Sequence, residues 1–145
     1  MSVDNPLGAT SNNLTFGALG NVTLAALGAG TERTIGNNIT FNTNRLIINN
    51  IDYGTGLTVL PVNLTGNVLL NLPTPGDILL RRNLKMSGVV SGTGFNAGIY
   101  LAGDANTLTL SNTANTFTNN IRWDNGCTLE VAGQIDSCVK SGATD

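Results

Sequence analysis

Apolar and polar residues alternate in short stretches along most of the chain. These stretches are four to eight residues long, rich in Leu, Ile, Val, Thr or aromatic residues, and bounded by Gly or Asn. They read NNLTF, NVTLAAL, NNITF, RLIINNI, GLTVL, GNVLLNL, GDILL, NLKMSGVV, GIYLA, TLTLS, NNIRW and CTLEV. No stretch keeps the three- and four-residue spacing of an amphipathic helix. The pattern predicts an all-β chain with about a dozen short strands.

A five-residue word recurs along the chain: an Asn pair, an aliphatic residue, a polar residue and an aromatic residue. Its copies are NNLTF (12–16), NNITF (37–41), NNIDY (49–53) and NNIRW (119–123). Their starts are 25 (37 − 12), 12 (49 − 37) and 70 (119 − 49) residues apart. These gaps fit about one, one half and three turns of a repeat of about 23 residues. The aliphatic and aromatic residues share one strand face, so we expect these pairs to point inward: Ile39 and Phe41, Ile51 and Tyr53, Ile121 and Trp123.

Two all-β architectures compete, a sandwich and a solenoid. Sandwich hairpins favour Asn-Gly or Asp-Gly turns, but the chain has one Asn-Gly, Asn125-Gly126, and no Asp-Gly. Unless the word repeats by chance in an Asn-rich chain, it favours stacked repeats. We therefore predict one domain over residues 1–145, a single-stranded right-handed parallel β-helix of about five or six coils. Residues 1–11 and 133–145 are its candidate caps or tails.

Composition narrows the function classes. Charged residues make up 11% of the chain and the net charge is −2, so the basic clusters of a nucleic-acid surface are missing and we expect no nucleic-acid partner. No apolar run approaches 18 residues, and we expect no membrane insertion by this segment. The chain has no His, which excludes His-based catalysis and His metal ligands. We expect neither a cofactor nor a metal.

One group of charged residues is a candidate polar patch. Carboxylates beside Arg side chains occur in β-helix enzymes that cleave polysaccharides, and the residues that could supply them here are Asp77, Arg81, Arg82, Arg122 and Asp124. Solvated charges at the edge of a coil are the alternative, which we favour because no spacing gives a clear carboxylate pair. We predict no catalytic residue and no enzyme activity.

The two cysteines, Cys127 and Cys138, are a candidate disulfide. A two-residue turn at Ala132-Gly133 would place them opposite each other in a hairpin, where an oxidising compartment would allow the bond. If the coil continues instead, these two residues, 11 apart (138 − 127), lie on different faces. They are then too far apart to form a disulfide, and both thiols stay reduced. Both alternatives remain open from the sequence.

Residues 84–132 resemble the autotransporter-associated β-strand repeat of bacterial autotransporter passengers. The matching pieces are SGVVSGTG (87–94), TLTLSNTANTFTNN (107–120) and NGCTLEVAG (125–133). Asn112 and Asn119 stand where the family usually has Gly, and Asn tolerates the same left-handed corners. RTIGNNITFN (33–42) resembles an upstream coil of such passengers. The resemblance implies an exported right-handed β-helix.

The function expected from this resemblance is a non-catalytic structural or adhesive module of an autotransporter-like surface protein. Its location would be extracellular or at the cell surface, and its partner a cell-surface glycan or a host or neighbouring protein. One alternative is a polysaccharide-binding or polysaccharide-cleaving β-helix domain. Another is a filament subunit that associates end to end, because open solenoid ends expose unpaired strands.

Overall fold

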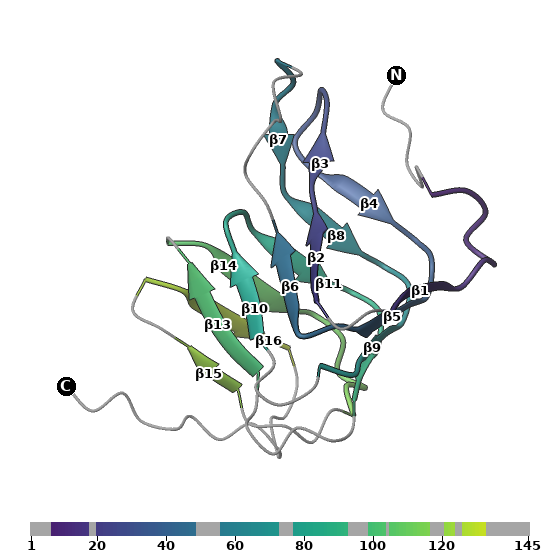
Figure 1. Cartoon of the computed structure of the whole chain (residues 1–145), viewed down its shortest axis with the longest axis vertical. Helices are drawn as coiled ribbons and strands as arrows, with labels where there is room; N and C mark the ends of the chain where they lie inside the picture. Colours follow the sequence, from purple (N-terminus) through teal and green to yellow (C-terminus); the bar gives the residue numbers. More distant parts are fainter. Residues whose placement is uncertain are drawn as a thin grey trace.

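The computed structural model describes residues 7–17, 20–48, 56–72, 77–92, 99–103, 105–116, 121–123 and 126–132. For 99–103 and 121–123 the description covers the backbone. Within these residues the chain forms sixteen β-strands and no helix (Figure 1). The prediction of an all-β chain is confirmed.

Most strands belong to three parallel sheets, numbered here 1 to 3. Sheet 1 contains, in spatial order, β1 (Leu14–Gly17), β5 (Ile39–Asn42), β9 (Val68–Leu70) and β12 (Val90–Ser91). Sheet 2 contains β2 (Asn21–Leu24), β6 (Arg45–Ile48), β10 (Asp77–Leu80), β13 (Ile99–Gly103) and β15 (Ile121–Trp123). Sheet 3 contains β4 (Arg33–Ile35), β8 (Val62–Leu64), β11 (Leu84–Met86), β14 (Thr107–Leu110) and β16 (Thr128–Val131).

The chain visits sheets 1, 2 and 3 in that order and then returns to sheet 1, and each such passage is called a circuit here. The first circuit holds β1, β2 and β4, the second β5, β6 and β8, and the third β9, β10 and β11. The fourth holds β12, β13 and β14, and β15 and β16 belong to the fifth. Each strand therefore pairs with its equivalent one circuit away, and the rest of the circuit supplies the long connection that parallel strands need.

Paired residues in neighbouring circuits are mostly 21 to 25 apart in sequence, from Thr107 and Thr128 (128 − 107 = 21) to Leu14 and Ile39 (39 − 14 = 25). This spacing is close to the repeat of about 23 residues predicted from the word. Three strand pairs are wider, at 29, 29 and 32 residues. All three span residues 49–61, so an insertion between sheets 2 and 3 of the second circuit lengthens the repeat there.

The longer connections between sheets 2 and 3 carry a small antiparallel pair. β3 (Ala26–Leu27) of the first circuit pairs with β7 (Val59–Leu60) of the second. In the third circuit the same corner is only residues 81–83, between β10 and β11. The β3–β7 pair therefore marks the first two circuits, where it lies beyond the ends of β2 and β4 (Figure 1).

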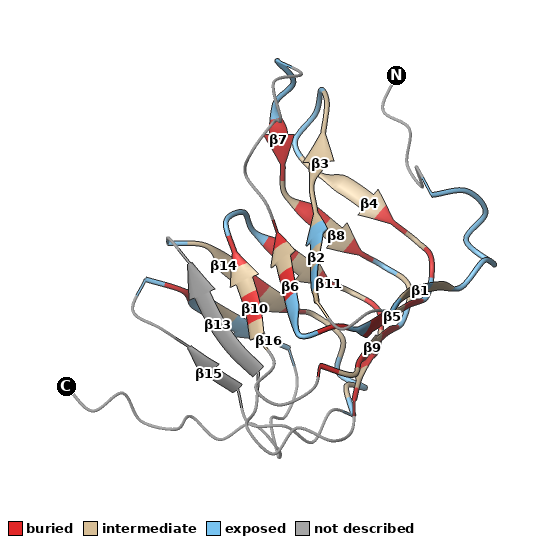
Figure 2. Cartoon of the chain, viewed as in Figure 1, coloured by how far each residue is buried: buried red, intermediate tan, exposed pale blue. Residues whose placement is uncertain are grey.

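The core lies between the three sheets, where strands such as β5, β6, β8 to β11 and β14 turn alternate residues inward (Figure 2). In β5, Ile39 and Phe41 are 2% and 0% exposed, while Thr40 between them is half-buried on the outer side. This confirms the inward prediction for that pair. The rings of Phe16 and Phe41, one circuit apart, stack with centroids 5.3 Å apart. Like residues therefore pack on like residues along the stack.

Glycines allow the corner between sheets 3 and 1 to stack closely. A Cβ added to Gly66 would lie 2.1 Å from the carbonyl oxygen of Asn37, one circuit back. A Cβ on Gly88 would similarly meet the carbonyl oxygen of Gly66, at 2.0 Å. Real Cβ contacts are not this short, so these two positions require glycine because the backbones of successive corners touch.

The repeated word does not mark one place in the fold. NNLTF and NNITF are equivalent, since Leu14 pairs with Ile39 and Phe16 with Phe41 in sheet 1. The strand of NNIRW lies instead in sheet 2, where Ile121 aligns with Ile99. NNIDY falls outside the described residues, as do the side chains of Ile121 and Trp123. The word therefore predicts a strand after an Asn pair, and that strand can belong to sheet 1 or to sheet 2.

Phe41→Ala tests the stacked core. The side chain is fully buried, so we expect the free energy of unfolding to fall by about 3–5 kcal/mol in urea denaturation. Thr40→Ala is the matched control on the outer face of the same strand and should cost less than about 1 kcal/mol. Equal losses for the two variants would contradict the assignment of inner and outer faces.

Candidate functional site

An outer row of sheet 2 carries the main charged contact. The register aligns Asn21, Arg45 and Asp77, and continues through Tyr100 to Arg122. Arg45 donates from Nε to Asp77 Oδ1 at 2.6 Å and from Nη2 to Asp77 Oδ2 at 2.6 Å. This is the two-pronged geometry that a guanidinium makes with a carboxylate. The bridge joins the second and third circuits.

The contact changes the ionisation of Arg45. The hydrogen bond to Asp77, and then the charge of that carboxylate, raise the pKa of Arg45 above its usual range. Because the folded-state pKa is the higher one, the contribution of the bridge through Arg45 is present throughout the neutral range and is lost only in strong alkali. The Arg45 side chain is 45% exposed and that of Asp77 17% exposed, so solvent screens the pair.

The other members of the candidate polar patch lie elsewhere along the circuit. Arg81 and Arg82 are exposed at the corner that follows β10. Asp77 begins β10, so four residues at about 3.3 Å each, or roughly 13 Å, separate its Cα from that of Arg81. Arg122 shares the outer row with Asp77 two circuits on, by backbone register, and Asp124 lies outside the described residues. The ion pair of Asp77 with Arg45 was not among the expected pairs.

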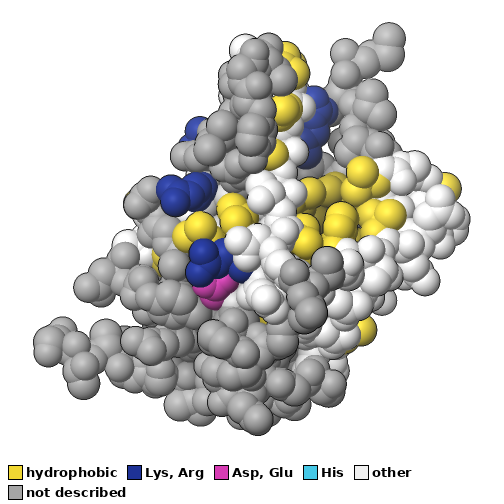
Figure 3. All heavy atoms as spheres, viewed as in Figure 1, with side chains coloured by type: hydrophobic (Ala, Val, Ile, Leu, Met, Phe, Trp, Pro, Cys, Tyr) yellow, Lys and Arg dark blue, Asp and Glu magenta, His cyan; other side chains and the backbone are white. Residues whose placement is uncertain are grey.

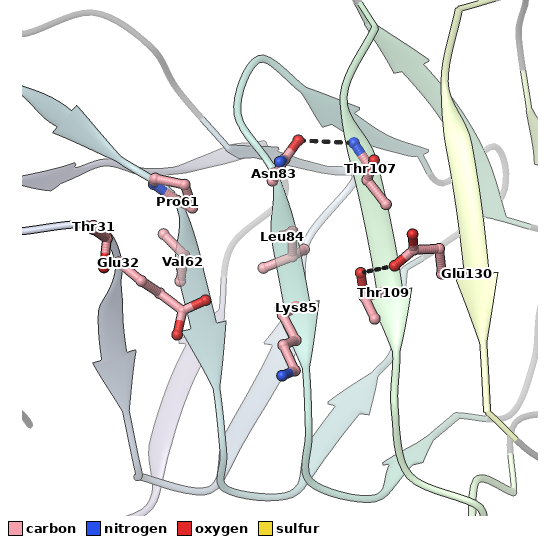
Figure 4. Close-up of a pocket in the computed structure, with 10 residues that line it drawn as sticks. All are labelled: Thr31, Glu32, Pro61, Val62, Asn83, Leu84, Lys85, Thr107, Thr109 and Glu130. Carbon is pink, nitrogen blue, oxygen red and sulfur yellow. Dashed lines mark hydrogen bonds between the residues drawn. The ribbon is translucent and has the colours of Figure 1, made fainter.

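A shallow groove of about 420 Å³ runs across the outer face of sheet 3 (Figure 4). Its lining comes from five neighbouring circuits: Thr31, Glu32, Pro61, Val62, Asn83, Leu84, Lys85, Thr107, Thr109 and Glu130. Lys85 lies near the middle, with Glu32 toward one side and Glu130 toward the other (Figure 4). The groove therefore offers one cation between two carboxylates, along with hydroxyl and amide groups.

Each carboxylate of the groove accepts a hydrogen bond from the neighbouring strand that lies nearer the middle of sheet 3. Glu32 accepts a hydrogen bond from Asn63 Nδ2 at 3.1 Å, and Glu130 accepts one from Thr109 Oγ1 at 2.9 Å. Asn63 is on β8 and Thr109 on β14, with β11 between them. Two strand spacings of about 4.8 Å therefore separate the anchors by roughly 10 Å. Glu32 precedes β4 and Glu130 lies on β16, so the sheet order places their backbones four strand spacings, or roughly 19 Å, apart. Glycosidase carboxylates instead converge to about 5–9.5 Å across the bond that is cleaved.

Asparagine side chains connect successive circuits at the corner before sheet 1. Asn38 Nδ2 donates to Asn13 Oδ1 at 3.2 Å, the backbone N–H of Asn67 donates to Asn38 Oδ1 at 2.9 Å, and that of Val89 to Asn67 Oδ1 at 3.1 Å. We call Asn13, Asn38 and Asn67 the asparagine ladder. It borders a second shallow groove, of about 280 Å³, on the outer face of sheet 1. A side-chain amide carries both a donor and an acceptor, so each Asn of the ladder can form a hydrogen bond with the circuit before it and with the circuit after it.

Other polar side chains also bond one circuit away. Asn71 Nδ2 donates to Asn42 Oδ1 at 2.9 Å, and Ser87 Oγ to Asn63 Oδ1 at 2.9 Å. Asn37, which is fully buried, donates to the carbonyl oxygens of Ala9 and Asn12 at 2.8 and 3.0 Å. Asn37 therefore fixes the segment before β1 to the second circuit. Its bond to Ala9 ties the described part of the candidate N-terminal cap to the second circuit.

The remaining sequence predictions concern cysteines, metals and membranes. Cys127 is buried immediately before β16, whereas Cys138 and residues 133–145 lie outside the described residues, so the disulfide and the C-terminal cap stay predictions. In the part of the chain that the structure describes, no cluster of three or more His, Cys, Asp or Glu residues could hold a metal ion. The same part contains no helix with the length and hydropathy to span a membrane.

Sequence reasoning missed both the asparagine ladder and the groove on sheet 3. The ladder had a visible signal, because Asn13 and Asn38 are the second Asn of two copies of the word. The groove had none, since Glu32, Lys85 and Glu130 follow no common motif. They line one groove only because sheet 3 places β4, β11 and β16 in one sheet, with β8 and β14 between them.

Searches with this chain against protein-family models, curated proteins and solved structures find no match. The resemblance to the autotransporter-associated repeat therefore remains a prediction from the quoted motifs. Any functional assignment for this chain has to be built from the contacts described above.

A double-mutant cycle on Arg45→Ala and Asp77→Ala measures the ion pair. We expect a coupling free energy of about 0.2–1 kcal/mol in urea unfolding, because the pair is well aligned but partly exposed. In 1 M salt, where the Debye length is about 3 Å, the coupling should shrink. A parallel cycle on Arg82→Ala and Asp77→Ala should give none. Equal coupling in the two cycles would contradict the assigned partner.

Proposed function

We propose that this chain is a non-catalytic structural and adhesive module, built as one right-handed parallel β-helix, from an exported bacterial surface protein. Its location would be the cell surface or the extracellular space. Its outer faces would contact a cell-surface glycan or a neighbouring protein. The observation that carries the proposal is the direction of the polar contacts, which run along the stack from one circuit to the next.

The direction of these contacts matters because catalysis and adhesion use polar groups differently. A catalytic site needs several groups that converge on one reacting atom. Here the amides of Asn38, Asn67 and Asn71 are engaged with other circuits at offsets of 22 to 29 residues. Side chains bonded in rows form flat, rigid and nearly neutral faces. Such faces suit a scaffold that presents contacts over an extended surface.

The β-helix architecture is supported by the cyclic order of the sheets. A chain that returns to each of three parallel sheets in turn has the connectivity of a solenoid coil. The hand is expected to be right, because a strand, crossover and parallel strand connect with that hand in about 98% of cases. The resemblance of residues 84–132 to the autotransporter-associated repeat supports the exported location in this proposal. It does not indicate which ligand the outer faces would bind.

A second candidate function, polysaccharide binding, is favoured by the groove on sheet 3. Lys85 aligns with Asn63 on one side and Thr109 on the other, so its ammonium has no like charge next to it in the row. With Lys85 between Glu32 and Glu130, and hydroxyl and amide groups around them, the groove offers hydrogen-bond donors and acceptors to the hydroxyl groups of a neutral saccharide. Glu32 and Glu130 come from opposite edges of sheet 3 and are held by separate partners, which favours binding over glycoside cleavage.

One polysaccharide panel, assayed for both degradation and binding, separates these functions. The proposal predicts no release of reducing ends from any polymer. If the groove binds neutral saccharides, Lys85→Ala should lower the affinity by about tenfold, which corresponds to 1.4 kcal/mol. Arg82→Ala is the control, an exposed cation that does not line the groove. Turnover that disappears in Asp77→Ala or Asp124→Ala would contradict the non-catalytic proposal.

A further inference from the structure

The first circuit leaves one end of the stack open in the described residues. β1, β2 and β4 are the outermost strands of sheets 1, 2 and 3 on the same side. Leu14, Phe16, Val22 and Leu24 pack against the core but are only half-buried. Their equivalents in the second circuit, such as Phe41 and Leu46, are fully buried. Figure 3 shows hydrophobic side chains gathered on the viewed face over the region of β1, β2 and β4.

Within the part of the chain that the structure describes, the last circuit is open in the same way. β16 is the outermost strand of sheet 3 on the opposite side. Leu129 and Val131 pack against the core and are half-buried. Their partners in β14, Leu108 and Leu110, are 1% and 2% exposed. The half-buried hydrophobic residues of the described core thus belong to the first circuit and to β16. At each end, the outermost strand of sheet 3 has no further described strand beside it.

We propose that the first circuit of one copy docks onto the last circuit of a second copy, head to tail. The occupant is fixed by strand direction and register. An added parallel strand continues the existing ladder only if it carries inward and outward residues in the same order. In sheets 2 and 3 the last circuit of this same chain meets that condition, because β15 and β16 continue the ladders that begin at β2 and β4. In sheet 1 the outermost described strand on that side is β12, from the fourth circuit.

The facing residues of sheet 3 are chemically compatible in this arrangement. Extending the register by one circuit places Val131 of one copy beside Ile35 of the next. On the outer face it places Glu130 beside Thr34. Glu130 already accepts a hydrogen bond from Thr109 on its other side, and Thr34 offers the same hydroxyl group. No like charges meet in this row.

One residue at the open end limits the strength of the contact. Arg33 lies in the inward column of sheet 3, where its neighbour Val62 is 1% exposed. Its Nε and Nη2 both lie 3.3 Å from the carbonyl oxygen of Leu27, to which they donate. An inward charge on an edge strand is a known device against strand addition. We expect Arg33 to make the association weak and reversible, so that Arg33→Leu strengthens it.

Head-to-tail docking has a distinctive consequence for assembly. Its two surfaces are different, so a copy bound at one end still has its other end free and growth continues. Docking of two first circuits would instead pair the same surface twice and stop at a dimer. The inference depends on the sheet edges and not on the proposed surface role. The polysaccharide panel and an association measurement can therefore fail independently.

Sedimentation velocity of the full chain over a range of concentrations tests the inference. The expected result for the unmodified chain is a mass that rises with concentration beyond the dimer. Val22→Lys should weaken association by about tenfold or more, since it places a charge in an apolar contact. Thr23→Lys, on the exposed face of the same strand, should leave association unchanged. Circular dichroism checks that each variant is folded.

A mixing experiment with two variants tests whether the docking is head to tail. Leu129→Lys blocks the last circuit, as Val22→Lys blocks the first, and each variant alone should be monomeric. Mixed together, they retain one intact end each and should form a dimer that grows no further. A monomeric unmodified chain, a dimer limit in that chain, or a mixture that stays monomeric would each overturn the inference. If Val22→Lys does not fold, Leu14→Lys takes its place with Thr15→Lys as its control.

Discussion

Parallel, in-register stacking of equivalent residues is the interaction on which the rest of this structure depends. It sets the ladders of sheets 1 to 3, places Phe16 on Phe41, and brings the asparagine ladder into contact. Each strand has only two to five residues, too few to be stable by itself. Each is held because the circuits on both sides repeat its spacing, its inward residues and its corners. The two ends lack one of these neighbours, and there the core becomes half-exposed.

Stacking also explains the unusual composition. Neighbouring circuits lie about 4.8 Å apart, so identical charges in one row would repel at that distance, by about 1 kcal/mol even in water. Charges are accordingly few, at 11%, and they occur beside an opposite charge, as Arg45 and Asp77 do, or beside neutral residues, as Lys85 does. Asn can stack on Asn because its amide both donates and accepts. The polar faces are therefore built from amides and hydroxyls.

The alternation of apolar residues located nearly all of the strands, and each predicted stretch contains one. Two strands of sheet 3, β4 and β8, escaped prediction because they have three residues each and their local patterns are irregular. Arg33 occupies an inward position of β4, and Pro61 immediately precedes β8. Two other stretches, NVTLAAL and NLKMSGVV, each cover two strands on either side of a corner. Strands were thus predictable from local pattern, whereas corners within apolar stretches were not.

Long-range placement was beyond the sequence pattern for a different reason. Arg45 and Asp77 are 32 residues apart, well outside the regular repeat, because residues 49–61 and the longer connection from β9 to β10 both lie between them. The repeated word is likewise used in both sheet 1 and sheet 2, so it encodes a strand without encoding its sheet. Lys85, Glu32 and Glu130 come together only through the register of four strand pairs. Contacts that cross circuits require the register, and an insertion in one circuit changes the sequence spacing of every strand pair that spans it.

Disulfide mapping of paired cysteine substitutions tests the stacking register most directly. Thr15 and Thr40 are Cα partners on the outer face of sheet 1, so their spacing of about 4.8 Å suits a disulfide. Thr15→Cys with Thr40→Cys should therefore oxidise to an intramolecular bond between those residues, identified by peptide mass mapping. Gly17→Cys with Thr40→Cys is shifted by two residues, to roughly 8 Å, and should not. A bond in the shifted pair and none in the aligned pair would contradict in-register parallel stacking.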